Sequence, residues 1–314
     1  MGLSTKRTNS GVLTLAIGPR YRRMARRLAW SLDVHAPGLP RAVITDVPTH
    51  ALSRCFEHVI EFRPGASGVF GEKVRLDSYS PFTETLFIDA DSLVVGKLDD
   101  VWELMRQVPF AVIGHQSTSG RWYGDVAKMA AAVGANSLPL FNGGLYYFNQ
   151  SAAAGSVFAT ARDLMNRYEE LGLADHLIGH AEEPVVAMAL AKHGIEALDD
   201  GGTTMRTPIG LRGDLDIDVL RGYCSFDKEG EFSLASSRSR GERVTPRIMH
   251  FAGSWTQGFL YRRETLKLAL HRRLPFVPAT AVSLAVNFTT NVPYEVTAFL
   301  ARPLRPWVRR LRQA

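Results

Sequence analysis

Short apolar runs alternate with amphipathic stretches along most of this chain. Residues 12–17 form a β-rich apolar run that Gly18-Pro19 closes, which is typical of a buried strand followed by a turn. In residues 21–32 the apolar positions recur at helical spacing and arginines occupy the opposite face, which predicts an amphipathic helix. The same reasoning predicts strands at 42–45, 58–62, 85–88, 110–113, 144–148 and 247–251, and helices at 72–79, 99–106, 151–171 and 184–193. This alternation predicts an α/β fold with a mainly parallel sheet flanked by helices.

The later part of the chain has weaker patterning. Residues 240–245 are expected to form an exposed basic loop, and the main domain is expected to span residues 1–258. Residues 259–314 then form a basic, helical C-terminal extension, whose prolines beyond residue 274 restrict it to short or kinked helices. The chain contains no repeat of fixed period, which excludes solenoid and array architectures.

Composition places this chain of 314 residues among ordinary globular proteins. Hydrophobic residues make up 46% and charged residues 22%, so a large core is expected and general disorder is not. The apolar runs are shorter than the roughly 18–20 residues that cross a bilayer, and the first run is too short for a secretory signal. We therefore expect a cytoplasmic protein, in which Cys55 and Cys224 are small buried side chains rather than a disulfide or zinc ligands.

The positive charge is concentrated at the C-terminal end. The whole chain carries a formal net charge of +6, and residues 262–314 alone contain ten Lys and Arg against two Glu. The body is therefore nearly neutral, which argues against a nucleic-acid partner. Residues 302–312 interleave five arginines with apolar side chains. This segment either lies peripherally on an anionic membrane surface or forms a solvated helix that packs Trp307 and Leu311 on the domain.

A pair of aspartates follows one of the predicted strands. Asp89-Ala90-Asp91 comes directly after the apolar run 86–88, so a strand that continued into the motif would point both carboxylates to the same side. Ligands of open α/β sheets gather at the carboxyl ends of the strands, and carboxylate oxygens suit Mg²⁺ or Mn²⁺ with a bound phosphate or diphosphate. Three other aspartates share this spacing but lack a strand before them, and they are expected in turns or as caps: Asp214, Asp216 and Asp218.

Four segments, in order and spacing, resemble motifs of the glycogenin-like, nucleotide-sugar-dependent glycosyltransferases of family 8. The segments are 13–32, 73–76 (Lys-Val-Arg-Leu) through 86–94 (Leu-Phe-Ile-Asp-Ala-Asp-Ser-Leu-Val), 141–149 (Phe-Asn-Gly-Gly-Leu-Tyr-Tyr-Phe-Asn) and 250–255 (His-Phe-Ala-Gly-Ser-Trp). The resemblance implies a GT-A type, Rossmann-like fold, a UDP-sugar donor, Mn²⁺ (or Mg²⁺) as the metal, and hexose transfer with retention of configuration. It also implies that Asp89, Asp91 and His250 are the metal ligands and that Asn142 lines the sugar site.

The expected nucleotide-sugar site contains further residues. Lys73 or Arg75 lies where the family keeps a basic donor-binding residue, and Tyr21 either stacks on the base or covers the core. The two glycines of the Asn-Gly-Gly element either let the backbone approach the sugar or only open a strand with a tight turn. Ala16, Ile17 and Gly18 would surround the uracil at the end of the first strand. The remaining residues expected to bind the nucleotide sugar are Tyr21, Lys73, Arg75, Asp89, Ala90, Asp91, Gly143, Gly144 and Gly253.

Two positions depart from the family pattern. Thr256 stands where the family usually has a lysine that meets the diphosphate, and Glu182-Glu183-Pro184 stands nearest to a usual Asp-Gln pair. Glu182 or Glu183 would stabilise the sugar cation or act as a base, or else the two form an ordinary acidic helix N-terminus. Retention arises either through a covalent enzyme intermediate or through front-face attack, and by analogy we expect the front-face route.

Other functional classes fit the sequence less well. A haloacid-dehalogenase-type phosphatase would carry its Asp-x-Asp motif near the N-terminus, and a sugar nucleotidyltransferase would need a glycine-rich basic loop after the first strand. A catalytically inactive sugar-nucleotide or glycan-binding protein is the non-enzymatic alternative, since Thr256 replaces a cation. The sequence leaves the donor sugar, the oligomeric state and the acceptor open, whether the acceptor is a lipid-linked glycan, a natural product or a protein.

Overall fold

A computed structural model describes residues 8–63, 71–175, 179–209, 211–228 and 242–274, with positions 278, 280–282 and 285 beyond them. The chain divides into two compact units, Met1–Ala252 and Gly253–Ala314. The predicted arginine-rich segment 302–312 lies outside the described residues. No helix in the described part of the chain is both long and apolar enough to span a membrane.

A six-stranded sheet forms the centre of the first unit. Its strand order is β3-β2-β1-β4-β9-β6. The strands are β1 (Thr8–Ala16), β2 (Arg41–Thr45), β3 (His58–Glu61), β4 (Phe82–Ile88), β6 (Phe110–Ala111) and β9 (Leu145–Asn149). The pairs β1/β2, β2/β3 and β1/β4 are parallel, whereas β9 runs antiparallel to β4 and β6. The mainly parallel α/β sheet predicted from the sequence is confirmed.

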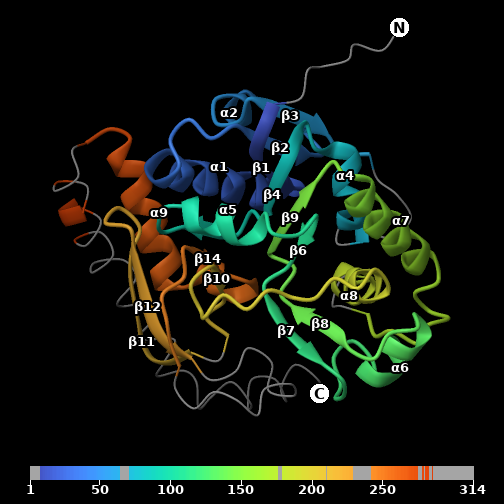
Figure 1. Cartoon of the computed structure of the whole chain (residues 1–314). Coiled ribbons are helices and arrows are strands. Elements are labelled where there is room, and N and C mark those ends of the chain that lie inside the picture. Colours follow the sequence, from blue (N-terminus) through green and yellow to red (C-terminus); the bar gives the residue numbers. More distant parts are fainter. Residues whose placement is uncertain are drawn as a thin grey trace, which may run out of the picture. The chain divides into compact units, whose positions relative to one another are not determined.

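Helices cover both faces of this sheet. They are α1 (Gly18–His35), η1 (Glu72–Arg75), α4 (Leu76–Tyr79), α5 (Asp99–Met105), α7 (Ala152–Asn166) and α8 (Glu182–Lys192). Figure 1 shows α1 and α5 on one side of the central strands and α7 and α8 on the other. Alternate residues of one strand face opposite sides, so Phe87 packs in the cluster with α7 and α8 while Leu86 and Ile88 pack in the cluster with α1 and α5. The sheet is therefore buried on both faces, as the continuous apolar strand sequences predict.

The first helix shows how closely the local pattern specifies the structure. The apolar positions at helical spacing in α1 are all buried: Met24, Ala25, Leu28, Ala29 and Leu32. Gly18 has a φ of 84°, in the left-handed region that glycine adopts readily, and Pro19 stands in the first turn of the helix, where its missing N–H costs no hydrogen bond. The turn between β1 and α1 is therefore set by these two residues.

Smaller elements complete the first unit. They are α2 (His50–Ser53), β5 (Ser92–Val94), β7 (Gly114–Ser117), α6 (Val126–Ala132), β8 (Leu138–Phe141), β10 (Met205–Arg206), β11 (Leu211–Asp218), β12 (Tyr223–Lys228), β13 (Glu242–Val244) and β14 (Ile248–His250). The strands among them form a sheet of order β10-β14-β5, a sheet of order β11-β12-β13 and the pair β7-β8. The second unit contains η2 (Gly253–Gln257) and α9 (Phe259–His271). The predicted domain boundary at residue 258 stays a prediction.

The structure departs in part from two expectations about the later part of the chain. The three aspartates expected in turns lie in strand β11, because Leu215 and Ile217 alternate with the acids and are buried while Asp216 is exposed. Asp218 ends this strand and accepts the backbone N–H groups of Leu220 and Arg221, so its expected turn or capping role is confirmed. Residues 242–244 of the expected basic loop form β13, where Val244 is buried against β12. Cys224 is buried as expected, but Cys55 is half-buried.

The contact between Gly11 and Phe82 generates a test of this packing. A Cβ added at Gly11 would stand against the buried Phe82 ring, so Gly11→Ala is expected to destabilise the fold by about 1–3 kcal/mol. Gly155 in α7 has open space around its added Cβ, so Gly155→Ala is expected to stabilise by about 0.5–1 kcal/mol. Urea unfolding of both variants measures the difference, and equal effects of the two substitutions would contradict the packing.

Candidate metal and nucleotide-sugar site

The aspartate pair lies in a turn at the carboxyl end of β4. The strand ends at Ile88, and the N–H of Ser92 donates to the carbonyl of Asp89 at 3.0 Å. Strand alternation is therefore not what brings the two carboxylates together, contrary to the sequence argument. The turn does so instead, at the edge of the sheet where ligands of α/β proteins bind.

Backbone pairing brings His250 to this turn from far along the sequence. Strand β14 pairs antiparallel with β5, and in this register His250 lies opposite Ser92. The N–H of Phe251 also donates to the carbonyl of Asp91 at 3.1 Å. The imidazole is thus placed beside the carboxylates by the ladder between two three-residue strands.

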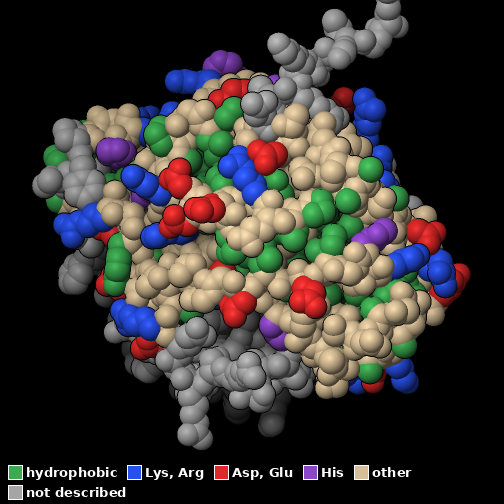
Figure 2. Space-filling model, in the orientation of Figure 1, with side chains coloured by type: hydrophobic (Ala, Val, Ile, Leu, Met, Phe, Trp, Pro, Cys, Tyr) green, Lys and Arg blue, Asp and Glu red, His purple; other side chains and the backbone are tan. Residues whose placement is uncertain are grey.

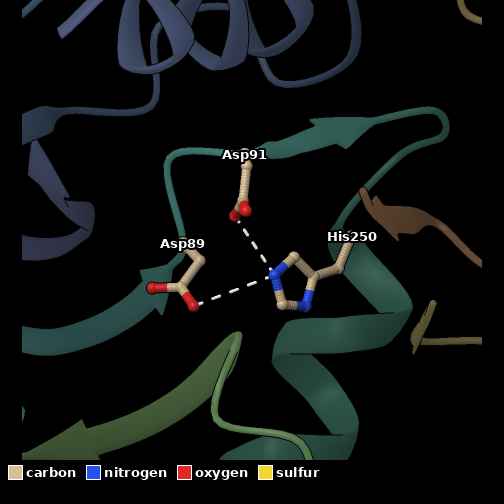
Figure 3. Close-up of side chains that lie close together, drawn as sticks. All are labelled: Asp89, Asp91 and His250. Carbon is tan, nitrogen blue, oxygen red and sulfur yellow. Dashed lines mark ion pairs between the residues drawn. The ribbon is translucent and has the colours of Figure 1, made fainter. Parts of the chain in front are cut away.

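Asp89, Asp91 and His250 form a compact group of metal-ligating atoms. Nε2 of His250 lies 3.1 Å from Oδ1 of Asp91 and 3.9 Å from Oδ2 of Asp89. Figure 3 shows both carboxylates directed toward this nitrogen. The three ligand atoms lie within 4.8 Å of one another, and the aspartate side chains keep 18% and 14% of their surface exposed. Two carboxylate oxygens and one imidazole nitrogen suit Mn²⁺ or Mg²⁺, so these residues fit a divalent cation that enters from solvent.

Opposite charges hold this group together. Burial alone would raise the pKa of Asp91, but the attraction of His250 outweighs it and the pKa lies below its ordinary value. Burial alone would lower the pKa of His250, but the charge of Asp91 and its hydrogen bond hold it above its ordinary value. Burial raises the pKa of Asp89 against the charge of Lys73. The imidazole therefore supplies positive charge where a metal ion would lie.

Lys73 joins the aspartate pair to helix α8. Its Nζ lies 2.9 Å from Oδ2 of Asp89 and 2.9 Å from Oε1 of Glu182, and it donates to the carbonyl of Gly143 at 3.0 Å. The lysine side chain is only 5% exposed, and the two carboxylates keep its pKa above its ordinary value against the effect of burial. The expected donor-binding lysine thus lies at the candidate metal site and bonds to Asp89, Glu182 and Gly143.

Glu183 occupies a separate position one residue further along α8. Its Oε2 accepts from the Tyr123 hydroxyl at 2.6 Å, and its Oε1 accepts from the N–H of Gly143 at 2.6 Å. Burial and the neighbouring charge of Glu182 raise the pKa of Glu183 to about 7. The two glutamates are therefore not equivalent, since Glu182 pairs with a lysine and Glu183 with uncharged donors.

The two glycines of the Asn-Gly-Gly element make room for side chains of the protein itself. A Cβ at Gly143 would collide with the Glu182 carboxylate, and a Cβ at Gly144 would stand 2.9 Å from Oδ1 of Asn142 and still closer to His250. The N–H of Asp89 donates to the carbonyl of Gly144 at 2.9 Å, which fixes this turn against the aspartates. Close approach explains both glycines.

The end of β1 lies near the same site. Ala16 ends the strand, and the N–H of Gly18 donates to Oδ1 of Asp46 at 3.1 Å. Burial and the charge of Asp91 raise the pKa of Tyr21, which places its hydroxyl within electrostatic reach of the aspartate pair. Tyr21 is therefore near the site, whereas its role on the base stays a prediction, as do those of Ile17 and the buried Ala90.

One expected residue bonds away from the aspartates, and another belongs to the second unit. Arg75 bonds to the carboxylate of Glu72 at 3.0 Å, one turn away along η1, so Lys73 is the basic residue of this segment that reaches the aspartates. Gly253 belongs to the second unit, where its carbonyl accepts from the Thr256 hydroxyl at 2.9 Å. The proposed contribution of Gly253 to nucleotide binding stays a prediction.

Sequence reasoning missed the roles of Tyr123 and Tyr146. The Tyr123 hydroxyl donates to Glu183, and the Tyr146 hydroxyl donates to Oε1 of Glu182 at 3.2 Å. Tyrosines are common in buried strands, and their polar partners are distant in sequence. Asp46 was missed as well, although its place directly after a predicted strand is a signal of the kind used for Asp89.

The surface around these elements carries mixed charge. On the face drawn in Figure 2, the described Lys and Arg side chains lie interspersed with Asp and Glu. Arg22 pairs with Asp46 at 2.6 Å, and Arg106 pairs with Glu84 at 2.9 Å. The basic side chains of these pairs are thus balanced by acids beside them.

Comparison with known proteins returns structures rather than sequences. No family model and no curated protein matches this chain. The glycosyltransferase GlyE of Streptococcus pneumoniae TIGR4 has 17% identity and a TM-score of 0.42. The match covers 62% of this chain and 46% of the GlyE chain. The galactosyltransferase LgtC, in complex with donor and acceptor sugar analogues, has 14% identity and a TM-score of 0.45 over 62% of this chain and 75% of LgtC. Mouse xyloside xylosyltransferase 1 has 14% identity and a TM-score of 0.42 over 63% of this chain and 88% of that protein.

The bonds of Lys73 generate a stability prediction. Lys73→Met leaves the buried carboxylates of Asp89 and Glu182 without their cation, so we expect a loss of about 3–5 kcal/mol in urea unfolding. Arg167 pairs with Glu170 on the surface, and Arg167→Met is the control, with an expected loss below about 1 kcal/mol. A Lys73→Met protein as stable as the control would contradict the network.

The raised pKa of Glu183 generates a pH prediction. The folded protein keeps the proton of Glu183 up to about pH 7, whereas the unfolded chain releases it near the ordinary value of 4.5. The contribution of Glu183 to the free energy of unfolding is therefore largest below pH 4.5, falls as the pH rises from 4.5 to 7, and is smallest above pH 7. Thermal melting of Glu183→Gln and of the wild type measures this contribution. Between pH 4.5 and 7 the melting temperature of the wild type should fall relative to that of the variant, and above pH 7 the difference should be constant. A difference that does not change with pH would contradict the raised pKa.

Proposed function

We propose that this protein is a metal-dependent glycosyltransferase that moves a hexose from a UDP-sugar to an acceptor hydroxyl with retention of configuration. The convergence of Asp89, Asp91 and His250 at the carboxyl edge of the sheet carries the proposal. These three residues come from two of the four segments that resemble family 8 glycosyltransferases. A third segment, with Asn142, Gly143 and Gly144, contacts the same site through His250 and Lys73.

In this proposal the two aspartates and His250 hold Mn²⁺ or Mg²⁺. A bound divalent cation neutralises the charge that develops on the departing nucleotide diphosphate. The chain holds the ligands rigidly, since Lys73 bonds to Asp89 while His250 bonds to Asp91. Tyr21 and the backbone of residues 16–18 would bind the uridine beside them, and Lys73 would add positive charge near the diphosphate.

The glutamates fit the front-face route better than a covalent intermediate. Glu182 is bonded to Lys73 and Tyr146, and Glu183 accepts from Tyr123 and from the backbone of Gly143. A nucleophile must leave such partners to attack, and the pKa of about 7 at Glu183 keeps part of its population protonated at neutral pH. We propose that the glutamates stabilise the positive charge of the sugar and position the site.

A catalytically inactive sugar-nucleotide binder is the second candidate. Thr256 favours it, because a hydroxyl that donates to the carbonyl of Gly253 supplies no charge to a diphosphate. The two candidates share the metal site and differ in turnover. The basic segment 302–312 would favour a membrane-borne acceptor for either one.

Substitution of one carboxylate tests the proposal. Asp91→Asn removes a ligand and leaves the pair of Lys73 with Asp89 in place, so the variant should keep its fold. Its Mn²⁺-dependent binding of UDP should weaken by at least about 10-fold in calorimetry. Asp216→Asn is the matched control, because Asp216 has the same spacing to Asp214 and lies exposed on β11. UDP that binds the wild type equally well without Mn²⁺ would refute the metal site.

Turnover separates the two candidates. The wild type with Mn²⁺ and a panel of UDP-sugars should release UDP slowly even without an acceptor, and Asp91→Asn should abolish this release. Binding of a UDP-sugar without any release of UDP, with or without sugar acceptors, would favour the inactive binder. Detection of a covalent glycosyl adduct on Glu183 by mass spectrometry would replace the front-face route by double displacement.

A further inference from the structure

Asn142 contacts the proposed metal site on the side away from the carboxylates. Its side-chain Oδ1 lies 2.8 Å from Nδ1 of His250 and accepts from the N–H of Gly144 at 3.0 Å. Asn142 precedes β9, whereas His250 ends β14, so the contact joins two sheets. The resemblance to family 8 implies a different task for this residue, namely lining the sugar site.

The backbone donor fixes which atom of the asparagine faces the imidazole. A peptide N–H only donates, so the Asn142 atom beside the N–H of Gly144 has to be the amide oxygen and not the amide nitrogen. An amide oxygen only accepts. Nδ1 of His250, 2.8 Å from the same oxygen, must therefore carry a hydrogen.

The other imidazole nitrogen is then set as well. Without a metal ion, Nε2 carries a hydrogen as well and donates it to Asp91. When a cation takes the place of that hydrogen, the imidazole is neutral, with its hydrogen on Nδ1 and its lone pair on Nε2. Nε2 is the nitrogen that lies 3.1 Å from Asp91 and 3.9 Å from Asp89. Asn142 thus keeps Nε2, rather than Nδ1, as the nitrogen that can offer a lone pair to a cation at the point where the carboxylates converge.

The residues around His250 leave room for its contact with Asn142, so the ring does not have to rotate to make it. A Cβ at residue 144 would stand against Nδ1 of His250 and 2.9 Å from Oδ1 of Asn142, so the glycine leaves the space that the contact fills. The imidazole keeps only 8% of its surface exposed. The ring is therefore held by the asparagine on one edge and faces the aspartates with the other.

We propose that Asn142 is a positioning residue, whose amide oxygen holds His250 in the tautomer and orientation that present Nε2 to a divalent cation. The inference rests on the metal site of the proposed function. Outer hydrogen-bond partners of metal-ligating histidines typically change metal affinity by about 10–100-fold when they are removed.

The first test measures metal affinity in the absence of nucleotide. Mn²⁺ titration followed by electron paramagnetic resonance should show about 10–100-fold weaker binding by Asn142→Ala than by the wild type. Asn142→Asp keeps an oxygen acceptor for both neighbours and should retain most of the affinity. Asn149→Ala is the matched control and should bind Mn²⁺ as the wild type does. Like Asn142, Asn149 accepts from the N–H two residues further along, that of Ser151, but it lies at the other end of β9.

The second test identifies the coordinating nitrogen. Nuclear magnetic resonance of the protein with ¹⁵N-labelled histidine and bound ¹¹³Cd²⁺ should show coupling of the metal to Nε2 of His250 and a hydrogen on Nδ1 in the wild type and in Asn142→Asp. A role of Asn142 in general stability alone would leave these signals unchanged in Asn142→Ala. The proposal expects them to be weakened or divided between the two nitrogens.

The outcomes separate this inference from the proposed function. Asn142→Ala that folds and binds Mn²⁺ as tightly as the wild type, or coordination through Nδ1 in the wild type, would overturn the positioning role and leave the metal site intact. A wild type that binds no Mn²⁺ would refute the metal site itself. If Asn142→Ala does not fold, Asn142→Asp still decides the question, because a large loss of affinity with the acceptor retained contradicts the proposal.

Discussion

The pairing of β5 with β14 is the constraint on which the site depends. Two strands of three residues place His250 opposite Ser92 and next to a turn that the chain made almost 160 residues earlier. Neither the imidazole nor the aspartates would form a ligand group without this ladder, because β4 alone carries only the carboxylates. The antiparallel return of β9 along β4 adds the Asn-Gly-Gly turn from a third direction. Backbone hydrogen bonds, rather than side-chain contacts, therefore determine which residues meet at this edge of the sheet.

Burial then determines what the assembled groups do. Each carboxylate taken from water requires a cation or hydrogen-bond donors to offset its desolvation. Asp89 and Glu182 share the ammonium of Lys73, and Asp91 has the imidazole. Glu183 accepts from the Tyr123 hydroxyl and from the N–H of Gly143. This division separates side chains of the same chemical type into different roles. The aspartates remain partly accessible, whereas Glu182 keeps only 4% of its side-chain surface exposed and acts within the protein.

The sequence was sufficient for most of the longer helices and strands and for the three side chains that meet at the candidate metal site. Apolar periodicity predicted α1 and the strands of the central sheet, because a buried strand or an amphipathic helix of five or more residues leaves a readable pattern. Strands as short as β5 and β10 leave none, and the aspartates of β11 concealed a real alternation behind residues that usually favour turns. The contacts of Asn142 and Tyr123 depend on partners more than 50 residues away, so local spacing does not contain them. The resemblance to a family suggested Asn142, but only the geometry assigns it a neighbour.

The bond between Lys73 and Asp89 makes the chemistry and the architecture of this protein inseparable. A mutation that removed Asp89 would take away one carboxylate that offsets the buried charge of Lys73, whose ammonium also bonds to Glu182 and to the Gly143 carbonyl. Loss of Asp89 in a descendant would thus carry a folding penalty at its first step. The fold would regain stability if Lys73 and Glu182 were also exchanged for apolar side chains of similar volume. In a descendant that has lost the metal site, we therefore expect Asp89, Lys73 and Glu182 to be replaced together.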